Sequence, residues 1–101
     1  MKSKVRPSHP GELIQEILNN TGVTQVALAK ALGVSRQTVS EVVRQRRPVS
    51  PDLSIRLSRV FPIQTPDLWL RMQLAVDIWD AEHAHSDEYL KIRPLKGCVA
   101  V

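Results

Sequence analysis

Residues 25–44 read QVALAKALGVSRQTVSEVVR, and their spacing decides the fold. The stretch holds two short segments of helical periodicity, and each of them follows a capping residue, Thr24 or Ser35. Ala29 is small enough for two helices to cross closely, and Gly33 takes a left-handed backbone conformation at little cost. The pattern therefore predicts two helices packed at a steep angle across a tight turn. The apolar seam that they share consists of Leu28, Leu32, Val34, Val39 and Val42.

Helical periodicity continues on both sides of this pair, behind further capping residues and prolines. The patterns predict five helices, near residues 10–20, 25–32, 36–45, 51–61 and 66–84. Beyond them, residues 88–94 alternate polar with apolar side chains, which predicts one short strand. A lone strand has no ladder partner in a helical chain, so we expect it to be disordered or to pair with another molecule.

The composition is that of one small domain. The chain has 101 residues, of which 43% are apolar and 24% are charged, a balance that is typical of globular proteins. Its single cysteine, Cys98, cannot form an internal disulfide, so the reducing cytoplasm is the expected compartment. No stretch has the length and apolar character of a signal peptide or a membrane span, so we expect no membrane partner.

Positive charge is concentrated in the part of the chain that holds the helical pair. Residues 1–64 carry ten Lys or Arg and four acidic residues, a net charge of +6. Residues 65–101 carry four basic and six acidic residues, a net charge of −2. The basic part favours a polyanionic partner, although a solvated surface of uneven charge would give the same totals.

The second helix of the pair has an apolar back and a front that is rich in hydrogen-bond donors. Such a front is suited to the major groove of DNA, where Arg and Gln read guanine and adenine edges. These features resemble the helix-turn-helix of the Cro and phage-repressor (XRE) class, whose seven apolar or small positions are all matched. The expected fold is therefore all-α, a five-helix lambda-repressor-like helix-turn-helix domain over residues 1–85, with the C-terminal strand and tail over residues 86–101.

Three further blocks resemble the HigA antitoxins of type II toxin–antitoxin modules, over about residues 6–82. The blocks are HPGE at 9–12, SIRLS at 54–58 and PDLWLRMQ at 66–73, with Asp77 beyond them. The resemblance implies a homodimer that represses its own operon by binding double-stranded operator DNA. It also implies that the protein neutralises a small RelE-like ribonuclease, HigB, that is encoded beside it.

Five residues are predicted to contact base edges: Arg36, Gln37, Thr38, Ser40 and Glu41. The first four are implied by the resemblance. Glu41 departs from the family pattern, because a carboxylate only accepts hydrogen bonds. It either reads a cytosine amino group or pairs with Arg44 one turn along.

Contacts to the DNA backbone are predicted for a second group: Gln25, Ser35, Arg44, Arg46 and Arg47. The resemblance implies the contact by Gln25. The three arginines cluster where the second helix ends, and cations at that place usually meet phosphates. The alternative is an ordinary solvated loop.

The last helix carries more apolar residues than one core-facing stripe needs, which predicts a second buried face in a symmetric dimer. Its tryptophans could instead stack on single-stranded bases, but their aliphatic surroundings favour a core or dimer contact. Pairing of the predicted strand across the two-fold axis would complete this dimer. The expected interface residues are Trp69, Trp79, Tyr89, Leu90 and Ile92.

Catalysis and metal binding have little support in the sequence. No nucleophile with a nearby base, glycine-rich phosphate loop or paired-carboxylate constellation is present, so we expect no enzyme and no cofactor. His83, His85 and Cys98 lack the spacing of a zinc site, so no metal is expected. Two alternatives to the antitoxin stay open, a stand-alone XRE-family transcription regulator without a toxin and a protein-interaction module.

Overall fold

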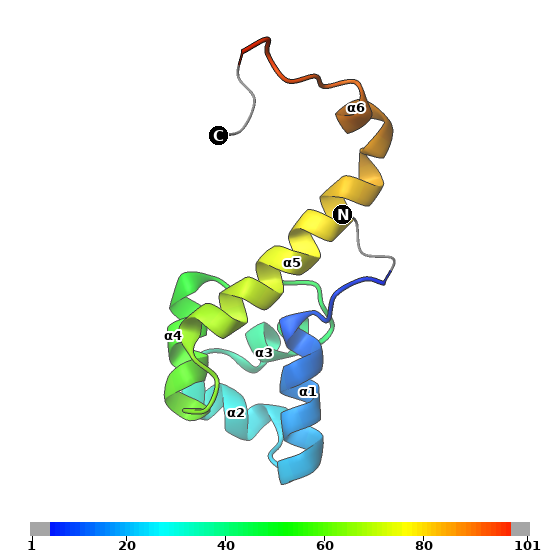
Figure 1. Cartoon of the computed structure of the whole chain (residues 1–101). Helices are drawn as coiled ribbons and strands as arrows, with labels where there is room; N and C mark the ends of the chain where they lie inside the picture. The colour runs from blue at the N-terminus through cyan, green and yellow to red at the C-terminus, as the bar shows by residue number, and fades with distance from the viewer. Residues whose placement is uncertain (1–4, 98–101) are drawn as a thin grey trace.

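The computed structural model describes residues 5–97, and every regular element in that range is an α-helix. The elements are α1 (Pro10–Thr21), α2 (Gln25–Leu32), α3 (Arg36–Val43), α4 (Pro51–Val60), α5 (Pro66–Ala84) and α6 (Ser86–Leu90). The first four helices and the start of α5 form one body (Figure 1). The rest of α5 extends beyond that body and carries α6 at its far end (Figure 1). The five predicted helices are therefore present.

Side-chain caps start the helices of the predicted pair. The Thr24 hydroxyl accepts the Ala27 N–H at 3.1 Å, and the Ser35 hydroxyl accepts the Thr38 N–H at 3.1 Å. Helix α1 begins differently, because its cap is His9, whose Nδ1 accepts the Gly11 N–H at 2.9 Å. This bond requires an unprotonated Nδ1.

The predicted C-terminal strand is wrong, since residues 86–90 form α6 and no strand occurs between residues 5 and 97. A single strand leaves its N–H and C=O groups unpaired, whereas a helical turn pairs them within the chain. The Tyr89 N–H donates to the His85 carbonyl at 3.1 Å, and the Ile92 N–H donates to the Tyr89 carbonyl at 3.1 Å. Acidic side chains in the first turn of α6 also favour the positive end of the helix dipole.

The core joins α1 to α5 in one apolar cluster. The predicted seam is part of it, with Leu28, Leu32, Val39 and Val42 buried and Val34 packed against them. Trp69 of α5 is 0% exposed and lies tilted against Phe61, with ring centroids 6.5 Å apart. This burial attaches α5 to the helix-turn-helix.

Gly11 determines how closely α1 approaches α3. A Cβ at this position would overlap the backbone carbonyl of Val42, so a larger residue would push the two helices apart. Gly33 has a φ of 73° in the turn between α2 and α3, as its place in the sequence predicts. The Arg56 side chain reaches this turn from α4 and donates to the Leu32 carbonyl at 2.9 Å.

Candidate nucleic-acid interface

The outer face of α3 is a polar surface with a shallow hollow of about 530 Å³. Four of the five predicted base-contacting residues line it, together with two arginines from the helix end: Arg36, Gln37, Ser40, Glu41, Arg44 and Arg46. Arg36 and Gln37 in the first turn of α3 are exposed, so their donors are accessible from outside the molecule. We call these six residues the α3 surface.

The other predicted DNA-contacting residues at the N-terminal ends of α2 and α3 do not line this hollow. Thr38 is half-buried, and its hydroxyl lies 2.8 Å from the Ser35 hydroxyl, which caps α3. Gln25 is the first residue of α2 and does not line the hollow. The structure therefore brings four predicted base contacts together and places Thr38 in the cap of the same helix.

Glu41 does not pair with Arg44, one of the two partners expected for it. Its carboxylate lies 3.4 Å from Nη2 of Arg47, whereas Arg44 donates to the Ser40 hydroxyl at 2.8 Å. The expected pairing of Glu41 with Arg44 is thus corrected, because the chain turns back after α3 and returns Arg47 to the helix. Exposed ion pairs of this kind contribute little stability, so a phosphate can replace Glu41 as the partner of Arg47.

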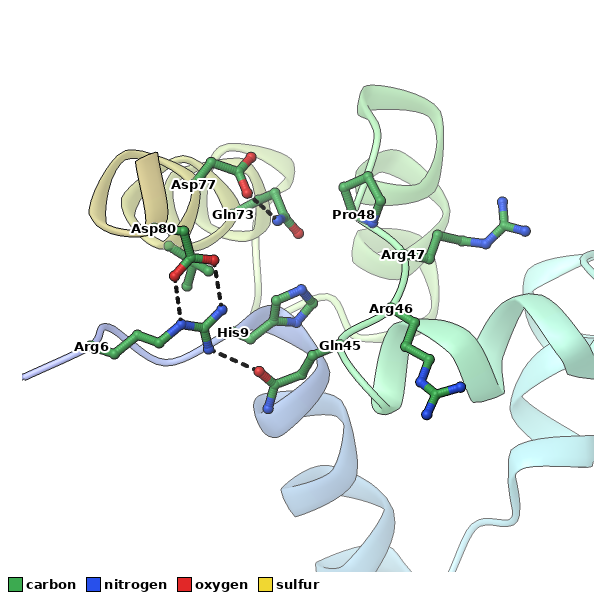
Figure 2. Close-up of a pocket in the computed structure, with 10 residues that line it drawn as sticks. Arg6, His9, Gln45, Arg46, Arg47, Pro48, Gln73, Asp77 and Asp80 are labelled. Carbon is green, nitrogen blue, oxygen red and sulfur yellow. Dashed lines mark hydrogen bonds and ion pairs between the residues drawn. The ribbon is translucent and has the colours of Figure 1, made fainter. Parts of the chain in front are cut away.

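The turn after α3 is built around Gln45, which has a φ of 64°. The Gln45 N–H donates to the Val42 carbonyl at 2.9 Å, and the Arg46 N–H donates to the Glu41 carbonyl at 2.8 Å. This is the Schellman arrangement that ends many helices. It turns the chain so that the side chains of Arg46 and Arg47 point away from α5 (Figure 2).

A second hollow, of about 260 Å³, lies between the N-terminal segment, the turn after α3 and α5 (Figure 2). On its walls, hydrogen bonds from the Arg6 guanidinium lower the pKa of Asp80, and the same contact raises the pKa of Arg6. Burial lowers the pKa of His9, and the positive charge of Arg6 lowers it further. Gln73 accepts the Val49 N–H at 2.9 Å and donates to Asp77 at 2.9 Å.

Sequence reasoning assigned no role to Arg6, Gln45, Gln73 or Asp80. Two signals in the sequence indicate part of this group: Gln73 and Asp77 are four residues apart on a predicted helix, and both belong to the PDLWLRMQ stretch and the Asp77 beyond it that resemble the HigA antitoxins. The other contacts join residues that are far apart in the chain, and local spacing carries no information about them.

The predicted dimer residues fall into three situations. Trp69 is in the core of its own chain and presents no surface to a partner, so its expected place at the interface is corrected. Trp79 is half-buried and stacks on His83, with ring centroids 3.7 Å apart. Tyr89 and Leu90 in α6 and Ile92 just after it are exposed.

Two exposed apolar residues on α5 are also absent from the expected interface. Leu74 is 58% exposed and Ile78 is 49% exposed, and their spacing of four residues places them on one face of the helix. The surplus of apolar residues in this helix was visible in the sequence, but which of them remain uncovered depends on how α5 packs.

Within residues 5–97, no group of three His, Cys, Asp or Glu side chains is placed to hold a metal ion. The Nδ1 atom of His83 lies 2.8 Å from the Trp79 carbonyl. Cys98, the third residue weighed for a zinc site, lies outside the described residues. None of the described helices is long and apolar enough to cross a membrane.

A helix-turn-helix whose second helix presents an exposed, cationic and donor-rich face defines a DNA-binding protein of the helix-turn-helix class. The helix-turn-helix family profile matches residues 14–68. The chain is 38% identical to antitoxin HigA-1 of Vibrio cholerae, over 93% of this chain and 89% of that protein. The chain therefore belongs to the HigA family of helix-turn-helix antitoxins.

Two solved structures have the same fold and are bound to DNA. The Pseudomonas aeruginosa antitoxin HigA, solved with the higBA promoter, matches with a TM-score of 0.83 and 37% sequence identity. The match covers 89% of this chain and 99% of the HigA chain. The antitoxin GraA in complex with its operator also has a TM-score of 0.83, with 40% identity and 99% of both chains covered.

Proposed function

We propose that this protein is the antitoxin of a type II toxin–antitoxin module and that it represses its own operon by binding an operator as a homodimer. The observation that carries the proposal is the α3 surface, which gathers donors and cations on the outer side of a helix-turn-helix. Its relatives HigA and GraA are solved on a promoter and an operator, which supports a DNA partner for this chain. The protein acts by binding and not by catalysis.

The second copy covers the apolar residues that one chain leaves exposed beyond its core. Leu74 and Ile78 contribute one face of α5. The half-buried Trp79 and the exposed Tyr89, Leu90 and Ile92, in α6 and just after it, add further apolar side chains toward the end of the described chain. Operator binding by a dimer of this class requires that symmetric pairing through these residues bring the two α3 helices to one side of the dimer. Such a pair fits inverted half-sites that lie about one turn of DNA apart, or about 34 Å.

The toxin partner is a RelE-like ribonuclease of the HigB type. The likeness to antitoxin HigA-1 over nearly the whole length of both chains supports this partner. A stand-alone regulator would share the α3 surface, so the toxin must be tested separately from the DNA.

The DNA test uses a duplex from the region upstream of the protein's own gene and a random duplex of equal length. We expect tight binding to the first and weak, salt-sensitive binding to the second. Gln37→Ala is expected to reduce upstream binding by about 5-fold to 150-fold, since one lost base contact costs about 1–3 kcal/mol, and to leave random binding unchanged. Equal affinity of the parent protein for both duplexes would contradict an operator-specific repressor.

The toxin test co-expresses the protein with the ribonuclease encoded by the open reading frame beside its gene, and it follows cell growth and mRNA cleavage. We expect the parent protein and Gln37→Ala to restore growth equally, because base reading is not required to bind a toxin. Restored growth identifies the antitoxin, whereas operator binding without any rescue would identify a stand-alone regulator.

A further inference from the structure

Arg6 joins three parts of the molecule that are distant in sequence. Its Nε and Nη2 atoms donate to the two carboxylate oxygens of Asp80 on α5, at 2.8 and 3.0 Å. Its Nη1 donates to the amide oxygen of Gln45 at 2.9 Å. Figure 2 shows the guanidinium between these two partners. This bidentate contact fixes the orientation of the Arg6 guanidinium relative to Asp80, which a single charge pair would not do.

Gln45 occupies a position that favours glycine, and its side chain forms hydrogen bonds with two other residues. The same Schellman turn ends α2, and there the left-handed residue is Gly33, with a φ of 73°. A residue with a side chain costs stability at this conformation. The oxygen of the Gln45 side-chain amide accepts a hydrogen bond from Arg6, and its nitrogen donates to the Glu12 carboxylate at 3.2 Å. The turn therefore has a side chain that connects it to its surroundings where glycine would have none.

A second attachment holds the other end of the same segment. The Val49 N–H donates to the buried Gln73 side chain on α5 at 2.9 Å. Gln73 is oriented in turn by Asp77, one helical turn along. Residues 45–49 are thus attached to α5 at both ends, and Arg46 and Arg47 lie between the two attachments.

We propose that Arg6 is a positioning residue for operator binding: through Asp80 and Gln45 it holds the phosphate-contacting segment 45–49 at a fixed place on α5. This inference rests on the proposed function, in which α5 pairs two copies and the segment meets DNA. A displacement of the segment relative to α5 then alters the distance between the phosphate contacts of the two copies. Arg6 acts on DNA binding through its neighbours: three of its N–H groups donate to Asp80 and Gln45. The side chains of Arg46 and Arg47, in contrast, point away from α5 (Figure 2).

The test compares Arg6→Ala, Asp80→Asn and Arg71→Ala with the parent protein. Arg71 is the matched control, because it is also an arginine that pairs with an aspartate, Asp67, at 3.6 Å, and it lies at the other end of α5. Each protein is titrated with the upstream duplex, with the same duplex carrying one base pair inserted between the half-sites, and with a single half-site. We expect Arg6→Ala and Asp80→Asn to bind the upstream duplex about tenfold more weakly, the scale of coupling between contacting residues.

Their affinity for the single half-site is expected to stay within about twofold of the parent value, and their discrimination against the inserted base pair to decrease. Arg71→Ala should bind all three duplexes like the parent. Amide hydrogen exchange of residues 45–49 in the free proteins adds a readout without DNA, and only the Arg6 and Asp80 variants should exchange faster.

Three results would overturn the inference. Unchanged discrimination in Arg6→Ala shows that the attachment does not set the spacing. Opposite effects, with Asp80→Asn binding every duplex more tightly and Arg6→Ala binding every duplex more weakly, show that Arg6 contacts phosphate directly. Unchanged exchange of residues 45–49 shows that Arg6 does not hold the segment. Failure of the parent protein to bind upstream DNA is a different outcome, because it refutes the proposed function itself.

Discussion

His9 connects the start of α1 to the protonation state of one ring. Its Nδ1 accepts the Gly11 N–H, and burial lowers the pKa of the ring below the ordinary value of 6.5. The folded protein therefore keeps His9 neutral at a pH where the unfolded chain takes up a proton. The contribution of neutral His9 to the free energy of unfolding is fully present above about pH 6.5. It decreases as the pH falls below that value, by at most about 1.4 kcal/mol per pH unit for one proton.

Urea denaturation at several pH values between 7.5 and 5 measures this effect. We expect the free energy of unfolding of His9→Asn to depend less on pH than that of the parent, because Asn caps a helix but does not titrate in this range. Asp80 does not interfere, because Arg6 lowers its pKa from 3.8. Parallel curves for the two proteins would show that another group causes the pH dependence.

Arg46 lies on the α3 surface and belongs to the segment that is attached to α5. If it neutralises one phosphate, Arg46→Ala should reduce the slope of log affinity against log salt concentration by about 0.9. Titrations of the upstream duplex at four or five salt concentrations give this slope. Arg71→Ala is again the control and should retain the parent slope; an unchanged slope in Arg46→Ala would remove Arg46 from the phosphate contacts.

At the scale of elements, the contact between α1 and α3 depends on Gly11. Gly→Ala inside a helix usually stabilises a protein by about 0.5–1 kcal/mol, but here the added Cβ would overlap the Val42 carbonyl. We therefore expect the opposite sign for Gly11→Ala, a loss of about 1–3 kcal/mol in the free energy of unfolding. Thermal or urea denaturation measures this loss. Glu16→Ala, an exposed change on the same helix, should stay within about 0.5 kcal/mol of the parent.

Because α3 carries the α3 surface, Gly11→Ala should also weaken binding to the upstream duplex. A Gly11→Ala protein as stable as the parent would mean that α1 and α3 separate at no cost. The packing of these two helices would then not explain the glycine in the HPGE block.

At the scale of the whole molecule, α5 gives the chain its elongated shape, with principal extents of 54 × 25 × 22 Å. Its outer part exposes Leu74 and Ile78, and burial of such apolar area yields roughly 25 cal/mol per Å². We expect the double change Leu74→Ser and Ile78→Ser to convert a dimer into a monomer and to weaken upstream binding. Sedimentation at micromolar concentration measures the change, with Ala75→Ser as a control on the same helix. A double variant that stays dimeric would place the interface elsewhere.

The sequence by itself determined the five helices and the outer face of α3. Caps such as Thr24 and Ser35, the glycine turn at Gly33 and the apolar spacing all act within a few residues, so a linear pattern contains them. The strand predicted over residues 88–94 is wrong because a linear pattern contains only such local signals. Alternation at a period of two over seven residues predicts a strand only if a partner is present, and the chain instead pairs its backbone groups in local turns.

Tertiary structure alone decided which apolar residues are core and which polar residues meet. Trp69 and Leu74 are similar in the linear pattern, yet the packing of α5 buries the first and leaves the second 58% exposed. The contact of Arg6 with Asp80 spans 74 positions, and that of Val49 with Gln73 spans 24. Such contacts depend on the relative placement of whole helices, which is set by packing across the core, and so no local pattern encodes them.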